Sequence, residues 1–311
     1  MNTGAALESP VFFPSASPEG EALFGIFTAP AGRSNGTGVI LLAGGGHPSP
    51  GRNSNWVKLT RKLGQLGYHS LRFDYHGVGE SAGRLERLHL ARPFVDDLEG
   101  AVRWLVGRGV NDIVLLGTCF GARTALAGAA RITDLRGIAM LAGPIRDFEM
   151  GDPTHLPLSA YAKLAVNRVG IKKLLDRQKR AEYVRFARTK GRAAWDRTWQ
   201  RVTQRDGAAR IEPSANYHSA LQGLVERSVP TLIAFGAEEA FFYEFQKARS
   251  GKLGRLLNRG GGRIEVVATP CPLHGFTSVE AQETAEGLFL GWLARLPPLR
   301  GERTPVGAQQ A

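Results

Sequence analysis

Long apolar runs, cysteines and a secretion signal are what this 311-residue sequence has least of. No run of 18 or more apolar residues occurs, which argues against a transmembrane helix. The first twenty residues lack the basic start and the apolar stretch of a secretory signal, so we expect a cytoplasmic protein. The two cysteines, Cys119 and Cys271, are too few for a disulfide framework, and each thiol has to be judged by its surroundings.

Metal-binding and phosphate-binding motifs are missing as well. The glycine run 44–46 has neither the G-x-G-x-x-G spacing nor the following GK[ST] of a phosphate loop. Cys271 lies three residues before His274, but this pair offers fewer ligands than a zinc site needs, which favours a small loop residue. We therefore expect neither a metal nor an organic cofactor.

Positive charge is abundant and unevenly distributed. The net charge is +12, and residues 161–210 alone contain fifteen Lys and Arg against four Asp and Glu. Nearly all of the excess therefore lies in one stretch of fifty residues.

Short apolar strands and amphipathic helices alternate along most of the chain. This pattern is typical of a mostly parallel sheet with helices on both faces, in which sites gather at the carboxyl ends of the strands. An antiparallel edge is expected at the N-terminus, from the strand-like pieces at 10–13 and 21–28. Further strands are expected at 38–44, 69–75, 135–143, 230–236 and 263–268, and helices at 55–66, 92–107, 242–258 and 278–296. The stretch 113–128 predicts a buried strand, a tight turn and a small-residue helix.

The alternation stops between the strand at 135–143 and the strand at 230–236. Residues 148–215 are basic and helical in pattern, and we interpret them as an inserted helical lid. The predicted core then consists of residues 1–147 and 216–311, folded as one α/β domain.

The turn Gly117-Thr118-Cys119-Phe120-Gly121 has the outline of a nucleophile elbow with a thiol at its apex. Glycines are needed on both sides because a Cβ there would crowd the neighbouring strand and helix. The helix that begins at the apex directs its amide groups at Cys119, which favours the thiolate. The alternative is that Cys119 is only a small core residue, as free cysteines often are.

The chain resembles the α/β-hydrolase superfamily, as a variant with a cysteine elbow (G-x-C-x-G), because four of its sequence motifs match those of the superfamily. The resemblance covers about residues 20–296. It is carried by the elbow, by RFDYHGVGES at 72–81, by FGAEE at 235–239 and by LHGF at 273–276, with LLAGGGHP at 41–48 as a looser match. It implies an α/β-hydrolase fold.

The resemblance assigns two partners to Cys119. His274, on the loop after the last strand, matches the general base, and Glu239 matches the acid that orients it, with Glu238 as the neighbouring alternative. The alternative without catalysis is that His274 is a solvated loop residue and that Glu238 and Glu239 form a solvated acidic pair.

The oxyanion hole is expected to consist of two main-chain N–H groups. Phe120, just after the nucleophile, supplies one, and Gly45 supplies the other in preference to Gly46. Asp74 is expected to fix a turn near the site instead of reacting.

A Cys, His and acid set with an oxyanion hole carries out acyl transfer through an acyl-cysteine. We expect hydrolysis of carboxylic esters or thioesters. An acyltransferase or cyclase with the same intermediate, and a non-catalytic ligand-binding member of the fold, stay open as alternatives. The basic lid suggests polyanionic substrates such as acidic acyl-carrier protein or coenzyme A thioesters. Nucleic acid is less favoured as a partner because no nucleic-acid-binding motif is recognised.

Overall fold

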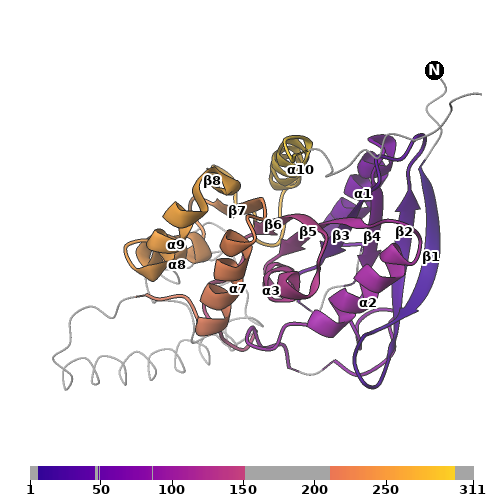
Figure 1. Ribbon diagram of the computed structural model, residues 1–311, viewed down its shortest axis with the longest axis horizontal. Coiled ribbons are helices and arrows are strands. Elements are labelled where there is room, and N and C mark those ends of the chain that lie inside the picture. The colour runs from indigo at the N-terminus through magenta and orange to yellow at the C-terminus, as the bar shows by residue number, and fades with distance from the viewer. Residues whose placement is uncertain (1–5, 46–47, 49, 86, 151–210, 298–311) are drawn as a thin grey trace, which may run out of the picture.

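A computed structural model describes residues 6–45, 48, 50–85, 87–150 and 211–297. These residues form an eight-stranded sheet with the strand order β1-β2-β4-β3-β5-β6-β7-β8 (Figure 1). The strands are β1 Leu7–Pro14, β2 Ala22–Ala29, β3 Thr37–Leu42, β4 His69–Phe73, β5 Asp112–Thr118, β6 Leu135–Leu141, β7 Thr231–Gly236 and β8 Ile264–Thr269.

The sheet has the predicted mixture of strand directions. β1 pairs antiparallel with β2, and β2 pairs antiparallel with β4, whereas every pairing from β4 through to β8 is parallel. The fold predicted from the sequence, a mostly parallel sheet with an antiparallel edge at the N-terminus, is therefore confirmed.

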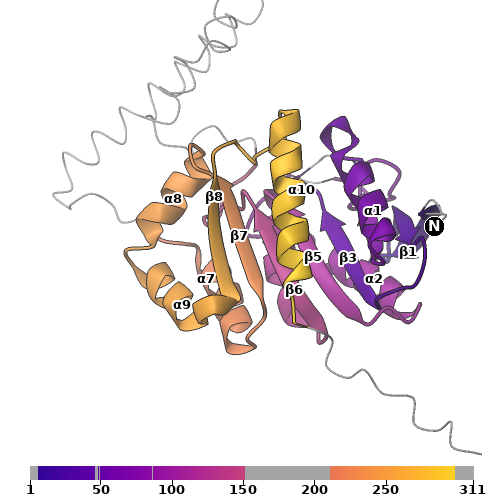
Figure 2. The same cartoon turned by 90° about the horizontal axis from the view of Figure 1, so that it is seen from above.

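Helices cover both faces of the sheet. α1 and α10 pack on one face, and α2, α3, α7, α8 and α9 pack on the other (Figures 1 and 2). Their bounds are α1 Asn55–Gln65, α2 Val95–Val106, α3 Phe120–Gly128, α7 Ala215–Glu226, α8 Ala240–Ala248, α9 Lys252–Gly260 and α10 Val279–Ala294. Short 3-10 helices occupy Arg52–Ser54, Ala129–Arg131 and Gly261–Arg263.

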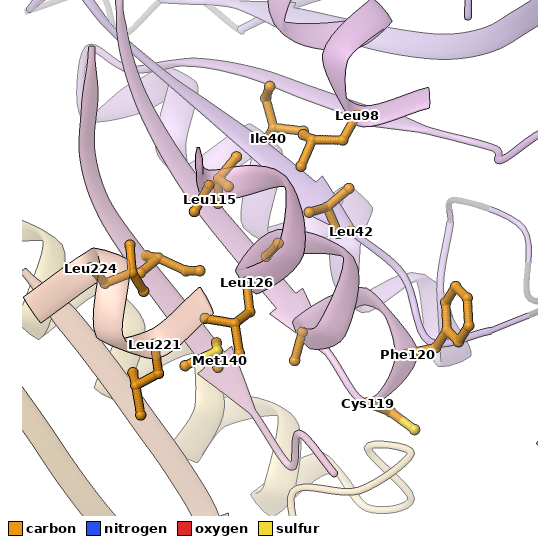
Figure 3. Close-up of a cluster of buried hydrophobic side chains, with 14 of the residues drawn as sticks. Ile40, Leu42, Leu98, Leu115, Cys119, Phe120, Leu126, Met140, Leu221 and Leu224 are labelled. Carbon is orange, nitrogen blue, oxygen red and sulfur yellow. The ribbon is translucent and has the colours of Figure 1, made fainter. Parts of the chain in front are cut away.

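The central strands are apolar on both sides because both faces are covered. In β3, Ile40 and Leu42 contribute to the cluster under α2, α3 and α7, while the alternate residues Val39 and Leu41 pack beneath α1 and α10. Figure 3 shows the first of these clusters around α3, where Leu115 and Met140 lie beneath the helix. The two clusters fix the position of α3 and of the turn before it.

Two predicted helices differ from the observed ones. The helix expected from residue 92 begins at Val95, because Pro93 disfavours helical backbone in the residue before it. The helix expected at 242–258 is two helices, α8 and α9, separated at Gly251, whose φ of −112° and ψ of −142° are not helical. Buried residues follow helical spacing within each helix, at 241, 244, 245 and 248 and again at 253, 256 and 257, and the sequence prediction merged the two.

Most of the predicted lid, residues 151–210, lies outside the described residues, and the division into core and lid stays a prediction. On its C-terminal side, α7 begins at Ala215 and is capped by the side chain of Ser214, which accepts from the N–H of Tyr217. None of the helices in the described part of the chain has the length and apolar character that crossing a bilayer requires.

Candidate active site

Cys119 occupies the turn where β5 ends and α3 begins (Figure 3). Its φ of 50° and ψ of −112° lie outside the regions that non-glycine residues ordinarily adopt. Its N–H donates to the carbonyl oxygen of Leu141 at 3.0 Å. Because such a conformation persists only where the surroundings impose it, the fold holds Cys119 at the apex of a strained turn.

The glycines on either side of Cys119 are required by close packing. A Cβ added at Gly121 would overlap the carbonyl oxygen of Leu42, and one added at Gly117 would overlap the carbonyl oxygen of Gly121. The start of α3 therefore lies directly against the end of β3, as the elbow pattern predicted.

Burial dominates the ionisation of the Cys119 thiol. The residue is 6% exposed, and desolvation raises the pKa of the thiol to about 11. The charge of Glu239 raises this pKa further, while the main-chain N–H of Phe120 lowers it. The amide at the helix start lowers this pKa, as expected, but desolvation outweighs it and the net pKa is raised.

The glycine loop after β3 lies beside the elbow. A Cβ added at Gly44 would be 3.6 Å from the Cβ of Cys119, and one added at Gly45 would be 3.3 Å from the Cβ of Phe120. The two residues predicted to form the oxyanion hole, Gly45 and Phe120, are therefore neighbours. Gly46, the weaker alternative, lies outside the described residues.

Glu239 connects the end of β7 to the loop that carries His274. It is the residue before α8, and its carboxylate accepts a hydrogen bond from the N–H of Gly236 at 2.9 Å and another from the main-chain N–H of His274. Burial raises the pKa of this carboxyl, and bonds from the main-chain amides of His274, Gly236 and Leu273 oppose the rise. Its neighbour Glu238 is exposed. Of the two predicted candidates for the acid, Glu239 is therefore the one that contacts the His274 loop, through its main chain.

His274 is exposed on the loop between β8 and α10. Its ring packs edge-on against Phe241 of α8, with ring centroids 5.3 Å apart. The next two residues, Gly275 and Phe276, have φ values of 76° and 46°, so the loop turns sharply after the histidine. Glu239 thus contacts the His274 loop on one side, and its charge acts on Cys119 on the other.

Asp74 holds a turn, as predicted. Its side chain accepts from the N–H of Glu80 at 3.3 Å, and its carbonyl oxygen accepts from the hydroxyl of Ser81 at 2.7 Å. A Cβ at Gly79, where φ is 56°, would overlap the carboxylate.

Cys271 is buried, and its carbonyl oxygen accepts from the hydroxyl of Thr269 at 2.9 Å. Within the described ranges, no group of three or more His, Cys, Asp or Glu side chains is arranged to hold a metal ion.

Sequence reasoning missed Arg123, which lies one turn after Cys119 in α3. It is 3% exposed, and its side chain is paired with Asp147. The available signal was a single arginine in the otherwise small and apolar helix FGARTALAG.

Comparisons with known proteins agree with this architecture. The sequence profile described as "Alpha/beta hydrolase family" matches residues 39–261. No curated protein sequence matches the chain.

Among solved structures, the chain is similar to the esterase Pf2001 of Pyrococcus furiosus, with 17% identity, 94% of this chain and 92% of that chain covered, and a TM-score of 0.59. It is also similar to the haloalkane dehalogenase DatA of Agrobacterium tumefaciens, with 16% identity, 93% and 97% covered, and a TM-score of 0.57. The proline iminopeptidase of Mycobacterium smegmatis has 17% identity, 92% and 98% covered, and a TM-score of 0.53. At such low identity these similarities show a shared fold.

Proposed function

From the membership of this chain in the alpha/beta hydrolase family, we propose that it hydrolyses carboxylic esters or thioesters through an acyl-enzyme formed on Cys119. One observation carries the proposal: Cys119 occupies a strained turn at a helix start, with Phe120 and the 44–45 glycines beside it. The similar structures named above include an esterase, a peptidase and a dehalogenase, so the fold by itself does not determine which type of bond is cleaved. A thiol nucleophile beside main-chain amides favours an acyl group.

The reaction begins when Sγ of Cys119 attacks the carbonyl carbon of the substrate while the thiol proton passes to the ring of His274. The carbonyl π electrons move onto oxygen, where the N–H groups of Phe120 and Gly45 stabilise the negative charge. Collapse of this intermediate expels an alkoxide or thiolate, which takes the proton from His274. A water molecule, deprotonated by His274, then attacks the acyl-cysteine and releases the acid and the free thiol.

The raised pKa of Cys119 supports proton transfer during the attack. With a thiol pKa of about 11, only about one molecule in ten thousand is a thiolate at pH 7. Burial thus favours the neutral thiol, and in the proposed reaction the base removes the proton as the C–S bond forms. Glu239 holds the main chain of the His274 loop, and its negative charge stabilises the imidazolium that results.

The basic stretch 161–210 suggests the substrate class. Its eleven excess positive charges, fifteen Lys and Arg against four Asp and Glu, attract anionic partners, and we propose acyl-carrier-protein or coenzyme A thioesters. We propose that this stretch belongs to a lid formed by residues 148–215. A reaction that depends on a free thiol suits the reducing cytoplasm, where we expect the protein to act.

Kinetics with two matched cysteine variants test the proposal. Cys119→Ala should lower kcat on a 4-nitrophenyl ester by at least about a thousandfold, because no group replaces the nucleophile. Cys271→Ala removes the other buried thiol and should retain activity within about threefold of the wild type. Retention of activity by Cys119→Ala would remove the acyl-cysteine from the account.

A further inference from the structure

A buried guanidinium lies directly behind the elbow. Arg123 is on α3, and its main-chain N–H donates to the carbonyl oxygen of Cys119 at 3.4 Å. Its side chain is 3% exposed, so each of its charged N–H groups has been removed from water. Four acceptors compensate: the carbonyl oxygens of Pro144 at 3.3 Å and Arg146 at 3.2 Å, Oδ1 of Asp147 at 2.5 Å and Oγ of Ser214 at 3.3 Å.

Three of these acceptors belong to residues 144–150, the segment that follows β6, which we call the strap. The strap also contacts α8, since Nε of Arg146 donates to Oε2 of Glu244 at 3.2 Å and Glu244 is 1% exposed. Phe148 stacks on Phe241 with ring centroids 6.2 Å apart, and Phe241 packs edge-on against His274. The strap therefore joins α3 to the helix that begins after Glu239.

A third side of the strap faces the chain near the glycine loop. The N–H of Leu90 donates to the carbonyl oxygen of Phe148 at 3.1 Å, and the N–H of Met150 donates to the carbonyl oxygen of Leu88 at 2.7 Å. A Cβ added at Gly45 would lie 2.6 Å from the side chain of Leu88. The strap is thus connected to every element that contributes a group to the proposed reaction.

We propose that Arg123 is a positioning residue for acyl transfer. Through the strap it fixes the first turn of α3, and with it the Cys119 thiol and the Phe120 N–H, relative to α8 and the His274 loop. Only a guanidinium suits this position, because a planar fork reaches several acceptors at once whereas an ammonium is a single point of charge. This inference rests on the proposed function, since it assigns the positioned groups to acyl transfer.

The chain offers a control for Arg123 in a second arginine that binds main-chain carbonyls at the other end of α3. Arg227, just after α7, donates to the carbonyl oxygens of Ala129, Ile132 and Thr133 at 2.7, 2.5 and 3.3 Å. These acceptors lie at and beyond the C-terminal end of α3, away from Cys119. Arg227→Met therefore removes a comparable set of bonds to carbonyls from the opposite end of the same helix.

The test compares Arg123→Met, Arg123→Lys and Arg227→Met. Arg123→Met should lower kcat at least about tenfold while KM changes less than about threefold, because displacing the nucleophile by a fraction of an ångström slows the chemical step. Arg123→Lys should not restore kcat. Arg227 is exposed, so Arg227→Met should lower the Tm less than Arg123→Met does, and it should keep kcat within about twofold of the wild type. Equal effects of Arg123→Met and Arg227→Met on kcat would overturn the positioning role.

A second measurement needs no substrate. The rate at which iodoacetamide alkylates Cys119, followed by mass spectrometry, should rise several-fold in Arg123→Met and stay unchanged in Arg227→Met, because only the first loosens the turn that buries the thiol. Asp147→Asn is a milder variant and should change the rate in the same direction. Equal alkylation in all three variants and the wild type would also overturn the inference. A Cys119→Ala protein that stays active would instead remove the proposed function, while the alkylation comparison still reports on Arg123.

Discussion

The Cys119 thiol lies at a helix N-terminus and yet ionises less readily than a thiol in water. The N–H of Phe120 stabilises the thiolate and lowers the thiol pKa. The residue is only 6% exposed, however, and desolvation raises the pKa by more than this single amide lowers it. A carboxylate, Glu239, acts in the same direction as burial. The resting site therefore holds a neutral thiol.

Alkylation of Cys119 should record this directly. Since only the thiolate reacts, the rate should keep rising by about tenfold per pH unit up to about pH 10, below the thiol pKa of about 11. The same cysteine in the urea-unfolded chain should level off near its ordinary pKa of 9.0. A folded-state rate that levels off at or below pH 9 would contradict the raised pKa.

Glu239 and Glu238 are adjacent carboxylates with different surroundings. Glu239→Gln places an amide N–H₂ opposite main-chain N–H donors and removes the charge, so we expect kcat/KM to fall about tenfold or more, and stability to fall by about 1–3 kcal/mol. Glu238→Gln changes an exposed side chain and should alter neither beyond about twofold or 0.5 kcal/mol. Steady-state kinetics and urea denaturation measure both. Similar losses in the two variants would count against Glu239 as the acid.

Single residues were predictable where the signal is local. The elbow pattern is contained in five residues, and the structure shows the overlaps that a Cβ at Gly117 or Gly121 would cause, the second of them against the end of β3. Arg123 was missed because its acceptors lie between 21 and 91 positions away along the chain. The direction of the Cys119 pKa was missed because burial depends on how the whole site packs.

At the scale of elements, the tight contact between α3 and β3 positions the candidate nucleophile. Gly121 lies so close to the end of β3 that no side chain fits, whereas Gly223 in α7 has open space where its Cβ would be. Both glycines are helical, which separates the effect of the close contact from that of helix propensity.

Gly121→Ala should therefore lower the free energy of unfolding by about 3 kcal/mol or more and abolish turnover, because α3 has to move away from β3. Gly223→Ala should leave turnover unchanged and be neutral to about 1 kcal/mol more stable, as expected for alanine in a helix. Urea denaturation and an ester assay on both variants measure this. A Gly121→Ala protein with normal stability and activity would show that the contact is not needed.

The order of the elements was largely predictable because β3, β5, β6 and β7 are short, mostly apolar runs, and all four are buried throughout or nearly so. Helix ends were less so. The break between α8 and α9 lies at Gly251, which adopts a non-helical conformation that the predicted continuous helix did not allow for. α7, Ala215–Glu226, falls where the expected lid ended and was not predicted as a separate element of the core.

The whole molecule combines a family fold with an uneven charge. The predicted membership in the alpha/beta hydrolase family, and with it the assignment as a hydrolase, is confirmed by a profile match over residues 39–261. The basic stretch 161–210 falls inside that match and outside the described residues. The proposed attraction of this stretch for anionic substrates depends on its net charge, so it is best tested by measuring turnover at different ionic strengths.

Turnover of an anionic thioester should be salt-dependent. For a coenzyme A thioester we expect kcat/KM to fall about tenfold between about 20 and 500 mM salt, because screening shortens the range of the attraction. An uncharged 4-nitrophenyl ester should show little change. Reversing Lys172, Lys173 and Arg177 to Glu should flatten the salt dependence, and reversing Lys58, Lys252 and Arg259, in α1 and α9, should not. Identical salt profiles for the two substrates would remove the anionic substrate class.

The most direct test of the central claim is peptide mass spectrometry after brief incubation with 4-nitrophenyl butyrate and acid quenching. The account predicts one butyryl group on the peptide that contains Cys119, released by hydroxylamine and absent from Cys119→Ala. Turnover of the ester with the acyl group on another residue, or with no acyl-enzyme under conditions that trap thioesters, would contradict it.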